Sequence, residues 1–415
     1  MSEAGPGSAW RRSGRGALAG AVVALAAAIA GCAPAGQGLR ITAEAPTGAG
    51  RPEQIAGEVV KTVRESFYDA PRGERWATEH AGYAAEAGTQ RAFAEATNAA
   101  LADLRTSHTA YATPADTQYY ALLAVFQRSL GLAAVEYGSI GADYARIDGA
   151  WYVRRVFAGG PAEAAGLRRG DRIVGADGGG FEPIASLQGR GRVELRIVRE
   201  AGGAEALVSV TPGRVNPKEE WLAAQKAGTR VIEAGGRRIG YIPLYSGAGE
   251  EFQDAVEEAI SGPLSGADAL VLDLRDGYGG CNPDFVNMFN SAVPVLRSTD
   301  RSGKTTVMDG QWRRPLVVLV NGGSRSGKEV VAFAVKSRRL GTLVGERTAG
   351  AVLGGRPFLL SDRSLLYLAT LDVEVNGVRL EGVGVQPDIW VQDDLPYAGG
   401  RDPQLDAAVA CAAGG

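Results

Sequence analysis

The segment from residue 315 to residue 335 constrains the fold most strongly. Pro315–Val320 is an apolar run of strand length, and the glycine-rich stretch Asn321–Glu329 follows it directly. Residues 330–335 then return to apolar side chains. This order predicts a strand, a tight turn and a helix near 327–337. The turn would present Ser326 at a helix N-terminus, where unpaired N–H groups and the helix dipole favour negative charge.

The spacing of apolar residues and glycines divides the rest of the chain into further units. From Arg238 onward, apolar runs of strand length alternate with helical patterns, which predicts an α/β domain over 213–400 and a terminal helix over 401–415. Residues 51–127 carry apolar positions at helical spacing without strand-like runs, so we expect a small helical domain. Residues 131–212 consist of short β-rich runs between glycine turns. The fold class is therefore multidomain α/β.

The N-terminus has the pattern of an export signal. Three arginines precede the uncharged run Ala17–Ala30, which is shorter than the roughly 20 residues that span a bilayer. The run ends at Gly31-Cys32 and resembles the lipobox of bacterial lipoproteins, in which the cysteine carries lipid. We expect residues 1–31 to be a signal peptide and residues 32–50 a lipidated Cys32 with a flexible tether. This places the protein in the cell envelope, in the periplasm or on the outer surface. The alternative is an ordinary secretory signal with an incidental cysteine.

Composition narrows the chemistry that the chain can perform. The formal net charge is −3, so no basic surplus favours nucleic acid as a partner. Two histidines, His80 and His108, exclude a multi-histidine zinc site, and three cysteines form no C-x-x-C pair. We therefore predict no metal and no cofactor.

Three interpretations compete for the turn around Ser326. The first is structural, because Ser326-Gly327-Lys328-Glu329 fits the S-x-x-E capping box. The second is a phosphate loop, since Gly322 and Gly327-Lys328 have G-x-x-x-x-G-K spacing, but Glu329 replaces the magnesium-binding hydroxyl. The third is a nucleophile, which needs a base. His108 follows a predicted helix and is the candidate, whereas His80 lies in a polar stretch typical of a surface residue.

The middle unit resembles a PDZ module. The string from Gly159 to Ile173 has a proline-started short helix, a glycine turn and Gly-Asp opening a strand. In that family the backbone N–H groups of a preceding loop receive the terminal carboxylate of a peptide, which adds as a strand to the sheet edge. The resemblance assigns this role to Gly138, Ser139, Ile140 and Gly141. The alternative is a spacer domain with a filled groove.

The chain as a whole resembles the serine peptidase family of C-terminal-processing (tail-specific) and tricorn-type proteases. This implies a peptidase core of the ββα, ClpP/crotonase-like type. Residues 321–329 resemble Asn-x-Gly-Ser-Ala-Ser-Ala-Ser-Glu, whose middle serine, the nucleophile, corresponds to Ser326. Leu274–Gly280 resembles Leu-Arg-x-Asn-x-Gly-Gly, with Gly277 in the Asn position. Two further segments, 345–351 and 381–389, resemble Gly-Glu-x-Thr-Phe-Gly-Lys and Glu-Gly-x-Gly-Val-x-Pro-Asp.

One departure selects the branch of the family. Ala351 stands where the tail-specific branch has its general-base lysine. Lys328 does not replace that lysine, because it follows Ser326 by two positions in the predicted helix, and this separation turns its side chain roughly 200° away from Ser326. The tricorn-type branch uses Ser, His, a second Ser and Glu.

The tricorn-type resemblance maps catalytic roles onto four residues of this chain: Ser326, His108, Ser107 and Glu381. The backbone N–H groups of Gly279 and Gly327 would form the oxyanion hole. The residue after the nucleophile is Gly327 rather than an acidic residue, so we expect no strong preference for cleavage after Lys or Arg.

Together these features predict a lipid-anchored serine endopeptidase. Ser326, with His108 as base, would cleave unfolded or tail-exposed polypeptides through an acyl-enzyme. The expected partners are polypeptides, through their C-terminal tails, and a membrane through the lipid. The alternative is a catalytically inactive lipoprotein that binds peptides through its PDZ module. The sequence predicts no oligomeric state.

Overall fold

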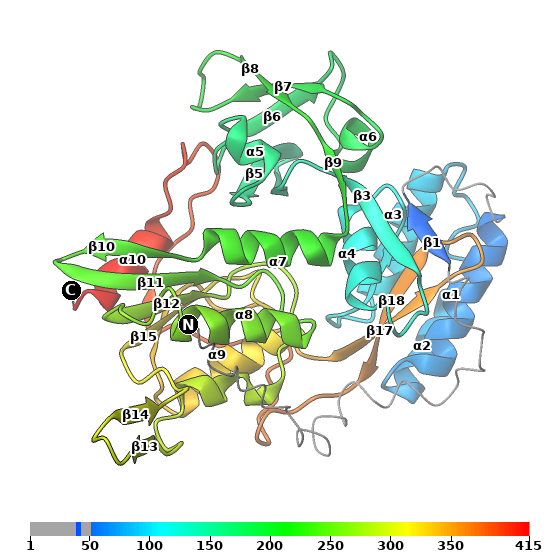
Figure 1. Ribbon diagram of the computed structural model, residues 1–415. Coiled ribbons are helices and arrows are strands. Elements are labelled where there is room, and N and C mark those ends of the chain that lie inside the picture. The colour runs from blue at the N-terminus through cyan, green and yellow to red at the C-terminus, as the bar shows by residue number, and fades with distance from the viewer. Residues whose placement is uncertain (1–38, 43–50, 415) are drawn as a thin grey trace, which may run out of the picture.

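A computed structural model describes residues 39–42 and 51–414 (Figure 1). The predicted signal peptide, Cys32 and most of the predicted tether lie outside these ranges. Among the described residues, no helix has the length and apolar character that crossing a membrane requires.

A six-stranded sheet forms the centre of the C-terminal half, in the order β10-β11-β12-β15-β16-β19. All neighbouring strands are parallel except β10 and β11. The two central strands, β12 and β15, are buried along their length because helices cover both faces. The strands are β10 (Arg230–Ala234), β11 (Arg237–Pro243), β12 (Ala269–Asp273), β15 (Leu316–Val320), β16 (Thr342–Gly345) and β19 (Ile389–Trp390).

Helices pack on the two faces of this sheet. On one face α7 (Pro217–Gly228), α8 (Glu250–Ser261) and α9 (Gly327–Ser337) share one apolar core with the strands and with the 3₁₀ helix Pro283–Phe289. On the other face α10 (Pro403–Ala412), coloured red in Figure 1, packs against β12, β15 and β16. The predicted α/β class is confirmed, and α9 has the predicted bounds.

The N-terminal helices do not stand apart from the core. Helices α1 (Pro52–Ser66), α2 (Ala70–Glu79) and α3 (Gln90–Ala102) share a core with β17 (Gly354–Leu359) and β18 (Leu365–Leu371). The short strand β2 (Ala110–Ala112) pairs with β18, although the sequence indicated no strand between 51 and 127. Three residues are too few to show strand periodicity, so this pairing is set by tertiary structure.

A separate five-stranded sheet lies at the top of Figure 1, in the order β4-β5-β6-β7-β8. It carries two short helices, α5 (Pro161–Ala164) and α6 (Pro183–Leu187). Its strands are β4 (Ala142–Ile147), β5 (Ala150–Val156), β6 (Arg172–Ala176), β7 (Val193–Val198) and β8 (Ala206–Val210).

A small three-stranded sheet stands next to helix α4 (Thr117–Val125), in the order β1-β3-β9. Its strands are β1 (Arg40–Thr42), β3 (Ala134–Ser139) and β9 (Gly213–Val215). Strand β1 falls within the predicted tether and is held because Ile41 is buried in the core around α4. The hairpin of β13 (Leu296–Thr299) and β14 (Thr305–Met308) projects at the lower left of Figure 1.

A buried ion pair fastens α10 to the sheet. The Arg275 guanidinium donates to Asp273 at the end of β12 and to both carboxylate oxygens of Asp402 before α10, at 2.7 Å. Replacing Arg275 by leucine would leave two buried carboxylates uncompensated, so we expect a loss of about 3–5 kcal/mol in the free energy of unfolding. Urea unfolding followed by circular dichroism measures it.

The exposed pair Arg91–Glu95 on α3 provides the control for this substitution. Replacing Arg91 by leucine should change the free energy of unfolding by less than about 1 kcal/mol. Equal changes in the free energy of unfolding of the two variants would show that the buried Arg275 ion pair stabilises the protein no more than an exposed pair does.

Candidate active site

Ser326 occupies a strained turn between β15 and α9. Its backbone has φ 55° and ψ −128°, a left-handed conformation that non-glycine residues avoid. Its N–H donates to the carbonyl of Ala351 at 2.8 Å, and its carbonyl accepts from the N–H groups of Glu329 and Val330. Its side chain makes no capping hydrogen bond. Strain of this kind concentrates at functional sites, where the surrounding structure holds it in place.

Glu329 explains why no capping box forms. Its buried carboxylate accepts from Thr348 Oγ1 at 2.6 Å and from the N–H groups of Gly350 and Ala351 at 2.8 and 2.7 Å. Burial raises the pKa of this carboxyl, while these donors lower it. Glu329 therefore fixes the 348–351 loop behind Ser326. A carboxylate committed in this way gives no support to the phosphate-loop interpretation. Sequence reasoning missed this role.

Ser107, His108 and Glu381 form one hydrogen-bonded chain. Ser107 Oγ lies 2.8 Å from His108 Nδ1 and donates to Glu381 Oε2 at 2.9 Å, and the Ser107 N–H donates to Glu381 Oε1 at 2.8 Å. Glu381 also accepts from the N–H of Val352 at 2.8 Å. The structure therefore brings together three of the predicted residues, although Ser107 and Glu381 are 274 positions apart.

His108 lies close to the turn that carries Ser326. Burial lowers the pKa of His108 to about 4; Glu381 opposes this shift and Arg325, the neighbour of Ser326, adds to it. A second connection runs through Ala351, which binds the Ser326 N–H, and Val352, which binds Glu381. Within the described residues no hydrogen bond joins Ser326 to His108, and such bonds often tighten only when substrate is bound. The imidazole is neutral near pH 7 and able to accept a proton.

The two predicted oxyanion-hole glycines lie close to each other beside Ser326. A Cβ atom on Gly279 would lie 2.5 Å from Ser326 Cβ and 2.7 Å from the Gly327 nitrogen. A Cβ atom on Gly327 would lie 2.4 Å from the Cys281 nitrogen. Only glycine allows these two loops to approach so closely, and the approach gathers backbone N–H groups beside Ser326.

Lys328 is fully buried and points away from Ser326, as helical geometry predicted. Its Nζ donates to the carbonyls of Leu244 and Asp276 at 2.5 and 2.6 Å, and to Tyr245 at 3.4 Å. Burial and, to a smaller extent, the charge of Arg155 lower the pKa of Lys328 to about 7. The side chain ties α9 to the loop that leads to Gly279. No pattern in the sequence indicated this contact.

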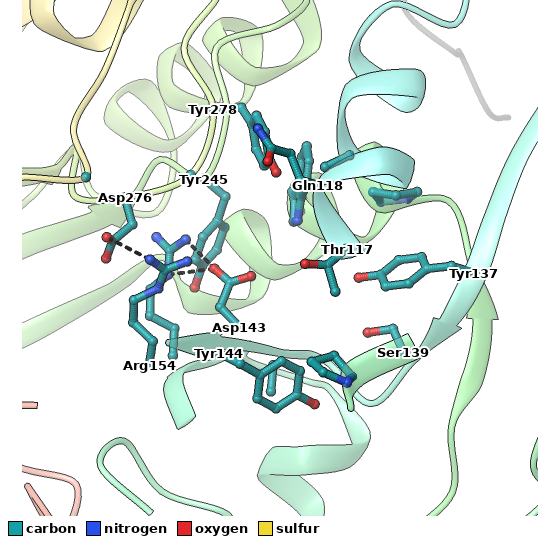
Figure 2. A pocket seen from close by; sticks show the side chains of 18 of the residues that line it. Thr117, Gln118, Tyr137, Ser139, Asp143, Tyr144, Arg154, Tyr245, Asp276 and Tyr278 are labelled. Carbon is teal, nitrogen blue, oxygen red and sulfur yellow. Dashed lines mark hydrogen bonds and ion pairs between the residues drawn. The ribbon is translucent and has the colours of Figure 1, made fainter. Parts of the chain in front are cut away.

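The predicted peptide-binding loop lies at the junction of β3 and β4. Two of its backbone donors are already used: Gly138 N–H donates to Gln188 Oε1 at 2.6 Å, and Gly141 N–H donates to Ser139 Oγ at 3.0 Å. Ser139 and Ile140 are buried. Gly138 and Ser139 also line a pocket between the five-stranded sheet and the peptidase core (Figure 2).

Part of the chain matches a known peptidase family. Residues 238–391 match the model of peptidase family S41. The chain is 30% identical over 264 residues to a chloroplastic C-terminal processing peptidase of Tetradesmus obliquus, a match that covers 57% of this chain and 56% of that protein. It is 32% identical over 305 residues to tricorn protease homolog 1 of Streptomyces coelicolor, covering 66% of this chain and 28% of the relative.

A crystal structure of the tricorn protease has a similar fold, with a TM-score of 0.53 at 18% identity. The superposition covers 88% of this chain and 36% of that one. This chain therefore spans little more than half of one relative and about a quarter of the other. The resemblance predicted from the motifs is confirmed. The chain contains a peptidase family S41 domain and is a relative of the C-terminal-processing and tricorn-type peptidases.

Proposed function

We propose that this protein is a serine endopeptidase that cleaves unfolded or tail-exposed polypeptides. The observation that carries the proposal is the Ser107–His108–Glu381 chain beside a serine in strained, left-handed backbone with an uncommitted side chain. A protein that only binds peptides needs none of these features.

The roles follow from the chemistry of each group. Neutral His108 takes the proton of Ser326 Oγ as the oxygen attacks the peptide carbonyl, and returns it to the leaving amine. Glu381, through Ser107, orients the imidazole and stabilises the imidazolium that forms. The N–H groups of Gly279 and Gly327 stabilise the oxyanion. Water then hydrolyses the acyl-enzyme on Ser326 with His108 again as base.

The substrate class and location follow from the relatives and the N-terminal sequence. Relatives named for C-terminal processing support polypeptide tails as substrates, and the five-stranded sheet is proposed to act as a PDZ-type module that receives them. The export signal and Cys32 predicted from the sequence support a location at the cell envelope, as a lipoprotein.

Two measurements on the purified full-length chain test this function. Incubation with an unstructured protein, followed by mass spectrometry, should show new peptide termini. A serine-reactive fluorophosphonate should add its mass to Ser326. Absence of both new termini and adduct, from protein shown to be folded, would contradict the proposal.

The pH dependence of activity should show an acidic limb near the low pKa of His108. Burial holds that pKa at about 4, so kcat/KM should rise as pH increases through about 4 and stay high at neutral pH. Rates with a short peptide between pH 3.5 and 7 measure this limb, with circular dichroism at each pH to show that the fold is retained. A limb centred at pH 6.5, the ordinary value, would mean that His108 is not the desolvated base.

A further inference from the structure

The pocket between the five-stranded sheet and the peptidase core extends to Arg325, the residue that precedes the proposed nucleophile. Its lining includes Gly138 and Ser139 of the predicted peptide loop on one side, and Tyr278, Gly323 and Arg325 on the other. Figure 2 shows Tyr137, Ser139 and Tyr144 on one side of it and Arg154 with Asp276 across from them. Because Arg325 precedes Ser326, whatever occupies this pocket lies within a few residues of the bond that is cleaved.

The charges that line the pocket leave one cation without a partner. Arg155 binds the Asp143 carboxylate at 3.1 and 2.5 Å, and Arg154 binds Asp276 at 3.3 Å. Both carboxylates that line the pocket are therefore paired. Within residues 51–414, no carboxylate forms an ion pair with Arg325, which is exposed. The pocket thus has a net positive charge beside the active site.

Two buried polar atoms on the pocket wall also lack partners in the described structure. Tyr144 Oη and Arg154 Nε are inaccessible to solvent yet make no hydrogen bond. Leaving such groups unpaired costs free energy, so unpaired groups on the wall of a pocket are a sign of a missing ligand. Both are donors, and both suit an acceptor such as a carboxylate oxygen.

Position 325 also departs from the motif that identifies the nucleophile. The motif has alanine where this chain has Arg325. An arginine offers a planar, permanently charged fork of donors that fits a carboxylate. The pocket therefore has a recognition group that the motif itself does not require.

We propose that this pocket is a carboxylate-binding subsite and that Arg325 is its specificity-determining residue. The inference rests on the proposed peptidase function and deepens it. The preferred polypeptide carries a carboxylate within a few residues of the scissile bond, supplied by an Asp or Glu side chain or by the chain end. Arg325 holds this carboxylate, and the donors on the pocket wall hold the surrounding segment.

A matched peptide series tests the subsite. Peptides with Glu or Gln at each of six positions around one cleavage site, each with a free or amidated C-terminus, are compared by kcat/KM. We expect one position, or the free C-terminus, to raise kcat/KM about tenfold, the effect of a charge-assisted hydrogen bond in a partly exposed site. The position distinguishes a side-chain carboxylate from a terminal one.

The variants locate the effect at Arg325. In the Arg325→Gln variant, acidic and neutral peptides should be cleaved with equal kcat/KM. In the Arg325→Lys variant, part of the preference for acidic peptides should remain. Because kcat/KM for acidic and neutral peptides is compared within each variant, a change in that variant's overall activity does not affect the comparison. Arg301→Gln, on the exposed β13–β14 hairpin, removes one charge elsewhere and should keep the full ratio. Equal rates for acidic and neutral peptides in the parent, or an unchanged ratio in Arg325→Gln, would overturn the subsite.

A binding measurement separates this inference from the peptidase function. The Ser326→Ala protein is titrated with fluorescent acidic and neutral peptides, followed by anisotropy at two salt concentrations. Tighter, salt-sensitive binding of the acidic peptide, lost with Arg325→Gln, supports the subsite even if no peptide is cleaved. If peptides are cleaved but neither kcat/KM nor binding depends on a carboxylate, the proposed peptidase function stands and the proposed subsite is wrong.

Discussion

Replacing Ser326 by alanine should reduce kcat by about 10⁴- to 10⁶-fold and leave the fold intact. Removing the nucleophile of a serine hydrolase leaves only the catalysis due to binding and the oxyanion hole. The side chain of Ser326 makes no capping hydrogen bond, so its removal orphans no known partner. Cleavage of an unstructured protein, quantified by mass spectrometry against the parent, measures the loss.

Ser324, two residues earlier, provides the contrast. Its buried Oγ donates to the Leu274 carbonyl at 2.9 Å and accepts from the Asn321 N–H. Ser324→Ala should therefore lower the free energy of unfolding by about 1–3 kcal/mol. A Ser326→Ala protein that still cleaves at a tenth of the parent rate or more would assign the nucleophile elsewhere.

Replacing Gly279 by alanine should lower kcat by at least about 10²- to 10³-fold, the loss expected when one oxyanion donor is misplaced. The new Cβ atom would lie 2.5 Å from Ser326 Cβ, so the two loops must move apart. This separation moves the N–H groups of Gly279 and Gly327 away from the developing oxyanion. Steady-state kinetics with a peptide substrate should show the loss mainly in kcat.

Gly322→Ala in the neighbouring turn is the matched control. A Cβ atom on Gly322 would meet no atom within 4 Å, and its φ lies outside the left-handed region. Its kcat should stay within about threefold of the parent value, since surface changes without contacts have small effects. If Gly279→Ala were equally harmless, the Gly279 loop would not form the oxyanion hole.

Local sequence patterns predicted the elements that depend on neighbouring residues. Helix α9 begins and ends where predicted, because its glycine turn and apolar spacing are continuous in sequence. The capping-box interpretation, one of three for the turn at Ser326, rested on local spacing alone. Three donors from the 348–351 loop bind the Glu329 carboxylate instead, and a single sequence does not show them.

Contacts between distant segments account for most of what the sequence did not predict. Strand β2 forms because it pairs with β18. Strand β1 forms because Ile41 is buried in the core around α4 and β3. Catalytic roles for Ser107 and Glu381 came from resemblance, since no spacing rule places residues 274 positions apart in contact. Nothing in the sequence indicated the contacts of Lys328, because a lysine after a turn usually faces solvent.

The pairing of β2 with β18 has a consequence for biogenesis. Strand β2 begins at Ala110, shortly after His108, and its only partner strand in the described structure is β18, at 365–371. A nascent chain shorter than this contains His108 without the strand that supports it, and Glu381 is synthesised later still. If the proposed function holds, proteolytic activity should therefore appear only after residue 381 has been synthesised.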